Sequence, residues 1–333
     1  MKQTNTTTNF NPPFLLQNTH TQTILNSIKL RLPIVKHRSR GMLNASTPHI
    51  LDCGDGVRLC GYYSGHTTEK TDLCILIHGW EGSSDSLYLL SAAGYLWNRG
   101  FDIFRLNLRD HGQTHHLNRE LFQSCRINEV VGAVKQIQES FDHNRLVLGG
   151  FSLGGNFAMR VAVRAPKAGI RLDQVAAVCP VLFPPSTMEA MEYGPAVYHH
   201  YFIKKWRRSL SLKQKAFPEI KELKHIPKFR SISEMTDYFV RNFTEYPDLN
   251  TYLNGYAITG DALTELTVPS TIIMSLDDPI IPAKDIRELA TPTCLKLETT
   301  KRGGHCGFLQ DLRLTSWADQ RMVELFQGAS IGV

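Results

Sequence analysis

Short apolar runs alternate with helical patterns along most of this chain, and this alternation limits the possible folds more than any other feature of the sequence. Such runs are typical of strands buried on both faces, and their alternation with helices predicts a mostly parallel sheet covered by helices on both sides. We predict strands at Leu73–Ile77, Asp102–Leu106, Leu146–Phe151, Val175–Cys179, Thr271–Ser275 and Cys294–Leu297. We predict helices at Leu87–Arg99, Asn128–Ser140, Asn156–Arg164, Ala283–Ala290 and Leu312–Phe326.

The N-terminal part of the chain does not show this alternation of strands and helices. Pro48–Cys53 and Val57–Tyr63 are strand candidates separated by Gly54-Asp55-Gly56, which is a hairpin signature. Ahead of this hairpin, an apolar run from Pro12 to Leu16 and an amphipathic stretch over residues 23–32 indicate an arm that packs on a domain.

The alternation breaks between Pro184 and Leu263, where aromatic residues and helical patches occur without a strand-like run. An insertion at this point of a parallel sheet lies over the carboxyl ends of the strands, where such folds place their sites. We therefore expect three parts: an N-terminal arm over residues 1–46, an α/β core over residues 47–183 and 264–333, and a helical cap over residues 184–263.

Basic residues are concentrated in the expected cap. Between Tyr198 and Arg230 there are ten Lys or Arg residues and two Glu residues, and the densest part is Lys204-Lys205-Trp206-Arg207-Arg208. A solvated helix face explains such a run, and attraction to an anionic substrate or a membrane surface is the alternative.

The overall composition excludes several classes of protein. A net charge of +6 is small for 333 residues, and most nucleic-acid binders concentrate such charge more strongly, so no nucleic-acid partner is expected. The seven cysteines lack zinc-ligand spacing, and several lie in apolar runs, which indicates free buried thiols and a cytoplasmic location.

Residues 1–11 lack a signal-peptide pattern, and no apolar run is long enough for a membrane-spanning helix, although association with a membrane surface remains open.

The strongest chemical motif is Gly150-Phe151-Ser152-Leu153-Gly154, directly after a predicted strand and before a predicted helix. A nucleophilic serine stands on such a sharp strand-to-helix turn, where flanking glycines let neighbouring backbone approach closely. The helix directs the positive end of its dipole toward a developing oxyanion. Gly-x-Ser-x-Gly is weak evidence alone, but in this position it predicts that Ser152 is a nucleophile.

A second motif, His78-Gly79-Trp80-Glu81-Gly82, follows the strand that ends at Ile77. Acyl transfer needs two backbone N–H groups aimed at the oxyanion, one from the residue after the nucleophile and one from the loop after an earlier strand. Leu153 and Trp80 are the candidates for these two donors. His78 is expected to be a structural hydrogen-bonding residue rather than a base.

Two further motifs follow the last predicted strands. Asp277-Asp278-Pro279 follows one strand and precedes a helix, where a carboxylate can fix the tautomer of a histidine, although an Asp-Pro turn explains it without catalysis. Gly303-Gly304-His305 lies in a glycine-rich loop that lets a histidine reach a distant serine. The order Ser, Asp, His favours a catalytic triad of Ser152, Asp278 and His305.

Other clusters support different chemistry less well. His111, His115 and His116 lie in one loop without a carboxylate that would complete a hydrolytic metal site. Cys306 follows His305, but a packing role is expected because Ser152 already occupies the nucleophile turn. The sequence therefore predicts neither a metal site nor a cofactor.

Together these motifs resemble the YheT-like branch of the α/β-hydrolase superfamily. The resemblance includes the loop from His78 with Ser86 and Tyr88, the Ser152 turn, Asp277-Asp278-Pro, Gly-Gly-His305-x-Gly-Phe, and Asn18-Thr-His-Thr-Gln-Thr23 in the arm. It covers nearly the whole chain and implies the α/β-hydrolase fold, esterase or lipase-like activity, and Ser152, Asp278 and His305 as the triad. It also selects Asp278 over Asp277. The segment from Asn107 to Gly112 and the cap depart from the branch, so substrate class is not transferred.

The function expected from these observations is a serine hydrolase that cleaves small-molecule or lipid acyl esters through an acyl-enzyme. An acyltransferase, in which an alcohol other than water accepts the acyl group, would use the same triad. A ligand-binding protein that keeps the fold without activity is a third interpretation.

Overall fold

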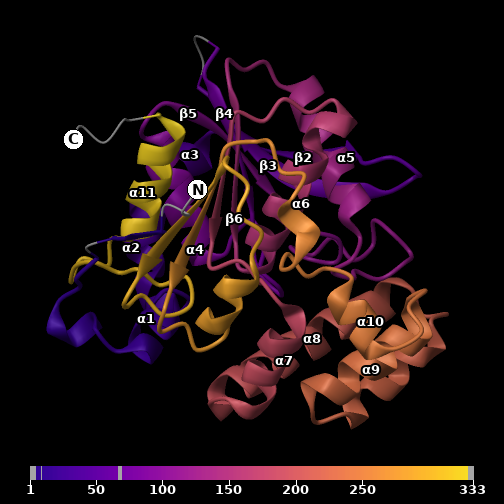
Figure 1. Ribbon diagram of the computed structural model, residues 1–333. Helices are drawn as coiled ribbons and strands as arrows, with labels where there is room; N and C mark the ends of the chain where they lie inside the picture. Colours follow the sequence, from indigo (N-terminus) through magenta and orange to yellow (C-terminus); the bar gives the residue numbers. More distant parts are fainter. Residues whose placement is uncertain (1–4, 9, 67–69, 329–333) are drawn as a thin grey trace.

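The computed structural model describes residues 5–8, 10–66 and 70–328, and Figure 1 shows a central sheet, helices on both of its faces, and a group of helices beyond one end. The sheet of the described residues has nine strands in the order β1-β9-β8-β7-β6-β4-β5-β3-β2. The strands are β1 Asn5–Thr7, β2 Ser46–Asp52, β3 Arg58–Ser64, β4 Asp72–Ile77, β5 Phe101–Leu106, β6 Leu146–Phe151, β7 Gln174–Val178, β8 Ser270–Ser275 and β9 Leu295–Thr300. Adjacent strands are parallel, except that β3 runs antiparallel to both β2 and β5.

Strand β4 shows how the apolar runs build two cores. Successive side chains of a strand point to opposite faces. Ile75 and Ile77 accordingly pack with α5 (Ile127–Ser140) and α6 (Leu153–Ala168), whereas Cys74 and Leu76 pack with α4 (Leu87–Trp97) and α11 (Trp317–Phe326). The near-continuous apolar run is therefore required because both faces of the strand are covered.

The N-terminal segment forms short helices that reach the opposite end of the chain. Helices α2 (Leu32–Arg38) and α3 (Arg40–Asn44) pack on α4, while α1 (Thr19–Leu25) contacts loops that follow β8 and β9. Strand β1 pairs with β9, and the sequence did not predict it because a short edge strand of polar residues pairs through its backbone and needs no apolar pattern.

Between β7 and β8 the described residues form helices and no strand, and Figure 1 shows most of these helices apart from the helices that cover the sheet, although the last of them, η4, contacts α6. They are α7 Pro184–Tyr193, α8 Ala196–Ala216, η3 Lys221–Lys228, α9 Ile232–Phe243, α10 Leu249–Asn254 and η4 Asp261–Leu263. An apolar cluster separate from the two cores of the sheet joins these helices to Leu121, and it includes Trp206 of α8, Phe239 of α9 and Tyr252 of α10. Among the described residues, no helix combines the length and apolarity needed to cross a bilayer.

Two predicted helices differ in the structure. The helix expected at Leu312–Phe326 begins only at Trp317, because Leu314 adopts φ +57° and the N–H of Gln310 donates to the carbonyl of Thr315 at 2.9 Å, which closes a turn. The helix expected at Ala283–Ala290 is a 3-10 helix, η5 (Ala283–Glu288). In both cases local hydrogen bonds outweigh a helical apolar pattern.

Candidate active site

Ser152 lies on the sharp turn between β6 and α6. Its backbone has φ +54° and ψ −122°, a conformation that L-residues rarely adopt and that stores strain. The flanking glycines are sterically required, because a Cβ on Gly150 would lie 2.2 Å from the carbonyl oxygen of Gly154, and one on Gly154 would lie 2.2 Å from that of Ile77. The turn projects the serine away from the end of the strand, toward the loop that carries His305.

His305 connects Ser152 to Asp278 through two hydrogen bonds. Its Nε2 lies 2.9 Å from Ser152 Oγ, and its Nδ1 lies 2.8 Å from Asp278 Oδ2. Burial of the imidazole, which lowers its pKa, is outweighed by the negative charges of Asp278 and Cys306, so that the pKa of His305 lies well above its ordinary value of 6.5. The structure thus brings together all three residues that the sequence suggested as a triad.

The two adjacent aspartates point to different partners. Asp278 contacts His305 with one carboxylate oxygen and accepts the N–H groups of Ile280 and Ile281 with the other, at 2.8 and 2.9 Å. Asp277 instead accepts the N–H of Gly304 at 2.9 Å and the hydroxyl of Ser275. Asp277 therefore ties the histidine loop to β8, whereas Asp278 contacts the imidazole itself.

Helix α1 holds the same loop from the other side. The hydroxyl of Thr23 accepts the N–H of His305 at 2.9 Å, and the amide of Asn26 donates to the carbonyl of Cys306 at 2.5 Å. The side-chain oxygen of Gln22 accepts the N–H of Leu309 at 2.7 Å, while its amide donates to the carbonyl of the same residue at 3.0 Å. The sequence resemblance included Gln22 and Thr23 but assigned them no part in the site.

The loop after β4 lies beside Ser152, since a Cβ on Gly79 would stand 3.1 Å from Ser152 Cβ. Within the described residues, the backbone N–H groups of Trp80 and Leu153 have no recorded acceptor, so both can donate to an oxyanion. The hydroxyl of Tyr88 accepts the N–H of Gly79 at 2.9 Å and thereby fixes the loop. The tyrosine was part of the sequence resemblance, but its role could not be read from the sequence.

The other histidines considered in the sequence analysis, His78, His111 and His115, each contact a different partner. His78 is buried, its Nδ1 donates to the carbonyl of Gly79 at 2.7 Å, and burial lowers the pKa of His78 to about 4. His111 donates to the carbonyl of Arg109 at 2.6 Å, and His115 contacts Ser209 at 2.9 Å. These contacts explain the histidines as structural groups.

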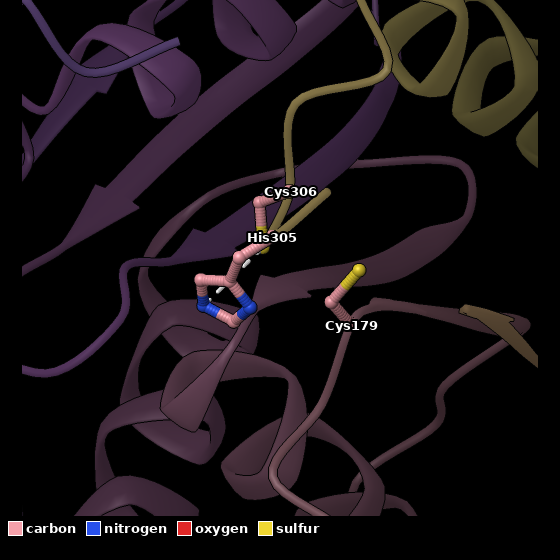
Figure 2. Close-up of side chains that lie close together, drawn as sticks. All are labelled: Cys179, His305 and Cys306. Carbon is pink, nitrogen blue, oxygen red and sulfur yellow. Dashed lines mark hydrogen bonds between the residues drawn. The ribbon is translucent and has the colours of Figure 1, made fainter. Parts of the chain in front are cut away.

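Cys179 and Cys306 lie next to His305 (Figure 2). One ligand atom from each of the three side chains lies within 4.8 Å of the other two, and Cys306 Sγ is 3.9 Å from His305 Nε2. Cys306 is buried in an apolar cluster, in keeping with the expected packing role, but burial, which raises its pKa, is outweighed by the thiol of Cys179 and by His305, so that the pKa of Cys306 falls to about 6. The thiol thus adds to the electrostatic environment of the imidazole.

An apolar cavity opens beside Ser152, between the core and the helices that connect β7 to β8. Its lining includes Ser152, Leu153, Met188, Phe202 and Ile281. Helix α8 forms one wall and packs on the loop after β4, because Trp80 stacks on Phe202 with ring centroids 5.4 Å apart. The cavity can therefore hold an apolar group next to the serine hydroxyl.

Comparison with known proteins places this fold in a family. The family model described as the alpha/beta hydrolase fold matches residues 73–312, which is most of the chain. The chain belongs to the α/β-hydrolase family. The narrower resemblance to the YheT-like branch remains a prediction.

Solved structures share the fold of this α/β hydrolase at low sequence identity. An esterase from Pyrococcus furiosus matches with a TM-score of 0.57 and 14% identity, covering 85% of this chain and 92% of that one. A 2,6-dihydroxy-pseudo-oxynicotine hydrolase matches with a TM-score of 0.59 and 14% identity over 95% and 77% of the two chains. A membrane phospholipase A, described as a bacterial virulence factor, matches with a TM-score of 0.55 and 15% identity over 95% and 98%. A search of curated proteins finds no match.

The basic run of this α/β hydrolase is only partly solvated. Lys204 and Arg208 are exposed on α8, but Lys205 donates to the carbonyl of Glu81 at 2.9 Å and Arg207 donates to the carbonyl of Phe229. Lys213, farther along the same helix, is fully buried. The interpretation of this segment as a solvated face is therefore wrong for several of its cations, since charge patterning along a sequence does not show which side chains reach buried acceptors.

Proposed function

We propose that this α/β hydrolase is a serine hydrolase that cleaves carboxylic esters through an acyl-enzyme. The observation that carries the proposal is the continuous chain of hydrogen bonds from Ser152 Oγ through His305 to Asp278, with distances of 2.9 and 2.8 Å. Both lie within the range in which a serine is activated by a histidine that a carboxylate orients. Esterase and phospholipase structures among the matches agree with this reaction class.

In the first step His305 Nε2 takes the proton of Ser152 as Oγ attacks the ester carbonyl. The N–H groups of Trp80 and Leu153 stabilise the oxyanion, and collapse of the intermediate releases the alcohol, which receives its proton from His305. In the second step His305 activates water, which releases the carboxylic acid and regenerates the serine. The carboxylate of Asp278 holds the imidazole in the tautomer that has a free Nε2.

Residues 184–263 would act in this reaction as a cap that bounds the acyl-binding cavity. Side chains from α7, α8, α9 and α10 line the cavity together with core residues. Lys204 and Arg208 are exposed on α8, where they would attract anionic or membrane-presented esters.

Replacement of the nucleophile tests the proposal. The Ser152→Ala variant should lose covalent labelling by a fluorophosphonate and lose several orders of magnitude in kcat on p-nitrophenyl esters, while its thermal unfolding stays close to that of the unaltered protein. Product analysis with added alcohols separates hydrolysis from acyl transfer. Undiminished labelling of the variant would show that Ser152 is not the nucleophile.

A further inference from the structure

Thr187 of α7 is a buried polar residue in the wall of the cavity that contains Ser152. Its exposed fraction is 5%, and its hydroxyl has no hydrogen-bond partner among the residues that the structure describes. A buried hydroxyl without a partner destabilises the folded protein, because it gives up its hydrogen bonds to water and gains none in return. Its presence in the cavity beside Ser152 therefore calls for a reason.

The helix that carries Thr187 does not satisfy this hydroxyl. A threonine within a helix commonly donates to the carbonyl four residues earlier, and Thr236 in the same cavity does so, donating to the carbonyl of Ile232 at 2.7 Å. For Thr187 the corresponding carbonyl, that of Phe183, accepts the N–H of Thr187 at 3.1 Å but does not accept its hydroxyl, and the neighbouring hydroxyl of Ser186 makes its shorter contact with Asp285 at 2.6 Å. The hydroxyl of Thr187 remains available to a ligand.

The surroundings of Thr187 offer no packing reason for a hydroxyl. Most of the residues that line the cavity are apolar, and a valine would fill nearly the same volume as Thr187 without burying a polar atom. Besides Ser152, Thr187 and Thr236, the lining nevertheless includes the hydroxyl-bearing residues Ser124, Tyr252 and Tyr256. Tyr252 accepts the N–H of Ser124 at 3.0 Å, which leaves its own hydroxyl hydrogen for a further bond.

We propose that Thr187 is a substrate-binding residue, and that the part of the ester held in this cavity carries a hydrogen-bonding oxygen rather than being a plain hydrocarbon chain. This inference rests on the proposed ester hydrolysis at Ser152. A keto, ether or hydroxyl oxygen would pair with Thr187, while the carbon chain around it contacts Met188 and Met191. A plain chain would leave the hydroxyl unpaired in a site from which the substrate has excluded water, and a site of this kind discriminates strongly.

The test compares matched esters. The first series consists of p-nitrophenyl hexanoate and analogues in which a keto or ether oxygen occupies successive positions of the acyl chain. A second series, acetate esters of similarly substituted alcohols, tests whether the cavity holds the alcohol side of the substrate instead. The unaltered protein should prefer one oxygenated position over the hydrocarbon parent by about tenfold in kcat/KM, the effect of one buried hydrogen bond. Thr187→Val should bring this ratio close to one, and Thr187→Ser should retain the preference because it keeps the hydroxyl.

Thr236→Val is the matched control, because it makes the same chemical change in the same cavity at a hydroxyl that already has a partner. It should leave the ratio of oxygenated to plain ester close to that of the unaltered protein. A second readout needs no substrate: Thr187→Val should unfold at the same or a higher temperature, since it removes an unpaired buried hydroxyl.

The possible outcomes separate the inference from the function on which it rests. Ester hydrolysis without preference for any oxygenated position, or a preference that Thr187→Val leaves intact, overturns the role of Thr187 but not that of Ser152. A marked loss of thermal stability in Thr187→Val also overturns it, because the hydroxyl would then have a partner within the protein. Absence of both hydrolysis and fluorophosphonate labelling in the unaltered protein would instead contradict the proposed function.

Discussion

At the scale of single residues, the neighbouring carboxylates Asp277 and Asp278 differ in the atoms that they contact. Asp278 lies 2.8 Å from the Nδ1 of His305, whereas Asp277 accepts a backbone N–H and a serine hydroxyl. The pair therefore provides a matched test of the triad within one turn of chain.

Asp278→Asn should lower kcat by about four orders of magnitude near neutral pH, because an amide favours the histidine tautomer that cannot take the serine proton. Asp277→Asn keeps an oxygen that accepts the N–H of Gly304, so its effect should stay within about tenfold and about 1 kcal/mol of stability. Both are measured on one p-nitrophenyl ester at saturating concentration, with thermal unfolding as a control for folding. The opposite ranking would assign the triad acid to Asp277.

The pH profile reports on His305. Activity requires the neutral imidazole, so kcat/KM should fall as pH drops through the pKa of His305, and the charge of Asp278 places this acid limb above the ordinary 6.5. Asp278→Asn removes that charge and should move the limb to lower pH. The rate of fluorophosphonate labelling, measured between pH 5 and 9, gives the position of the acid limb for both proteins even where turnover is slow. An acid limb that stays in place in the variant would show that the carboxylate does not set this pKa.

At the scale of elements, helix α1 supports the histidine loop. Thr23→Ala removes the acceptor of the His305 N–H and should lower kcat by roughly 10- to 100-fold with little change in KM, because a small displacement of a catalytic group is costly. Thr21→Ala, on the same helix but with a hydroxyl that contacts exposed Asn18, is the control and should leave kcat within about twofold. Equal effects of the two changes would argue for a general loss of helix stability instead.

Elements with a strong apolar period were predictable, and elements held by specific hydrogen bonds were not. The strand at Leu146–Phe151 agrees residue for residue, since a strand covered on both faces must be apolar throughout. Strand β1 and the late start of α11 depend on backbone pairing and a turn, which leave no periodic signal. In the same way the glycines around Ser152 predict its turn from the sequence. Thr23, Tyr88 and Thr187 act through tertiary contacts, which leave no pattern in the sequence.

At the scale of the whole molecule, a buried ion pair joins the helical insertion to the core. Lys213 of α8 donates to Asp110 at 2.8 Å and to the carbonyls of His115, Asn118 and Glu120, at 3.3, 2.6 and 3.1 Å. Burial lowers the pKa of Lys213 and raises that of Asp110, so each charge depends on the other.

Lys213→Met leaves Asp110 buried without its partner and should lower the free energy of unfolding by about 3–5 kcal/mol, as measured by urea denaturation. Lys215→Met, at an exposed position of the same helix, should change it by less than about 0.5 kcal/mol. A small effect at Lys213 would mean that the insertion is held to the core mainly by its apolar contacts.

The contact between helix α1 and the loops after β9 also bears on how the chain acquires its structure as it is made. Gln22 and its partner Leu309 are 287 residues apart. At a synthesis rate of roughly 5–20 residues per second, Gln22 waits roughly 15–60 seconds before Leu309 has been made. Ser152 is made part-way through that interval, 153 residues before His305, so that Ser152 meets its base only in the last stage of synthesis, when the two ends of the chain come together.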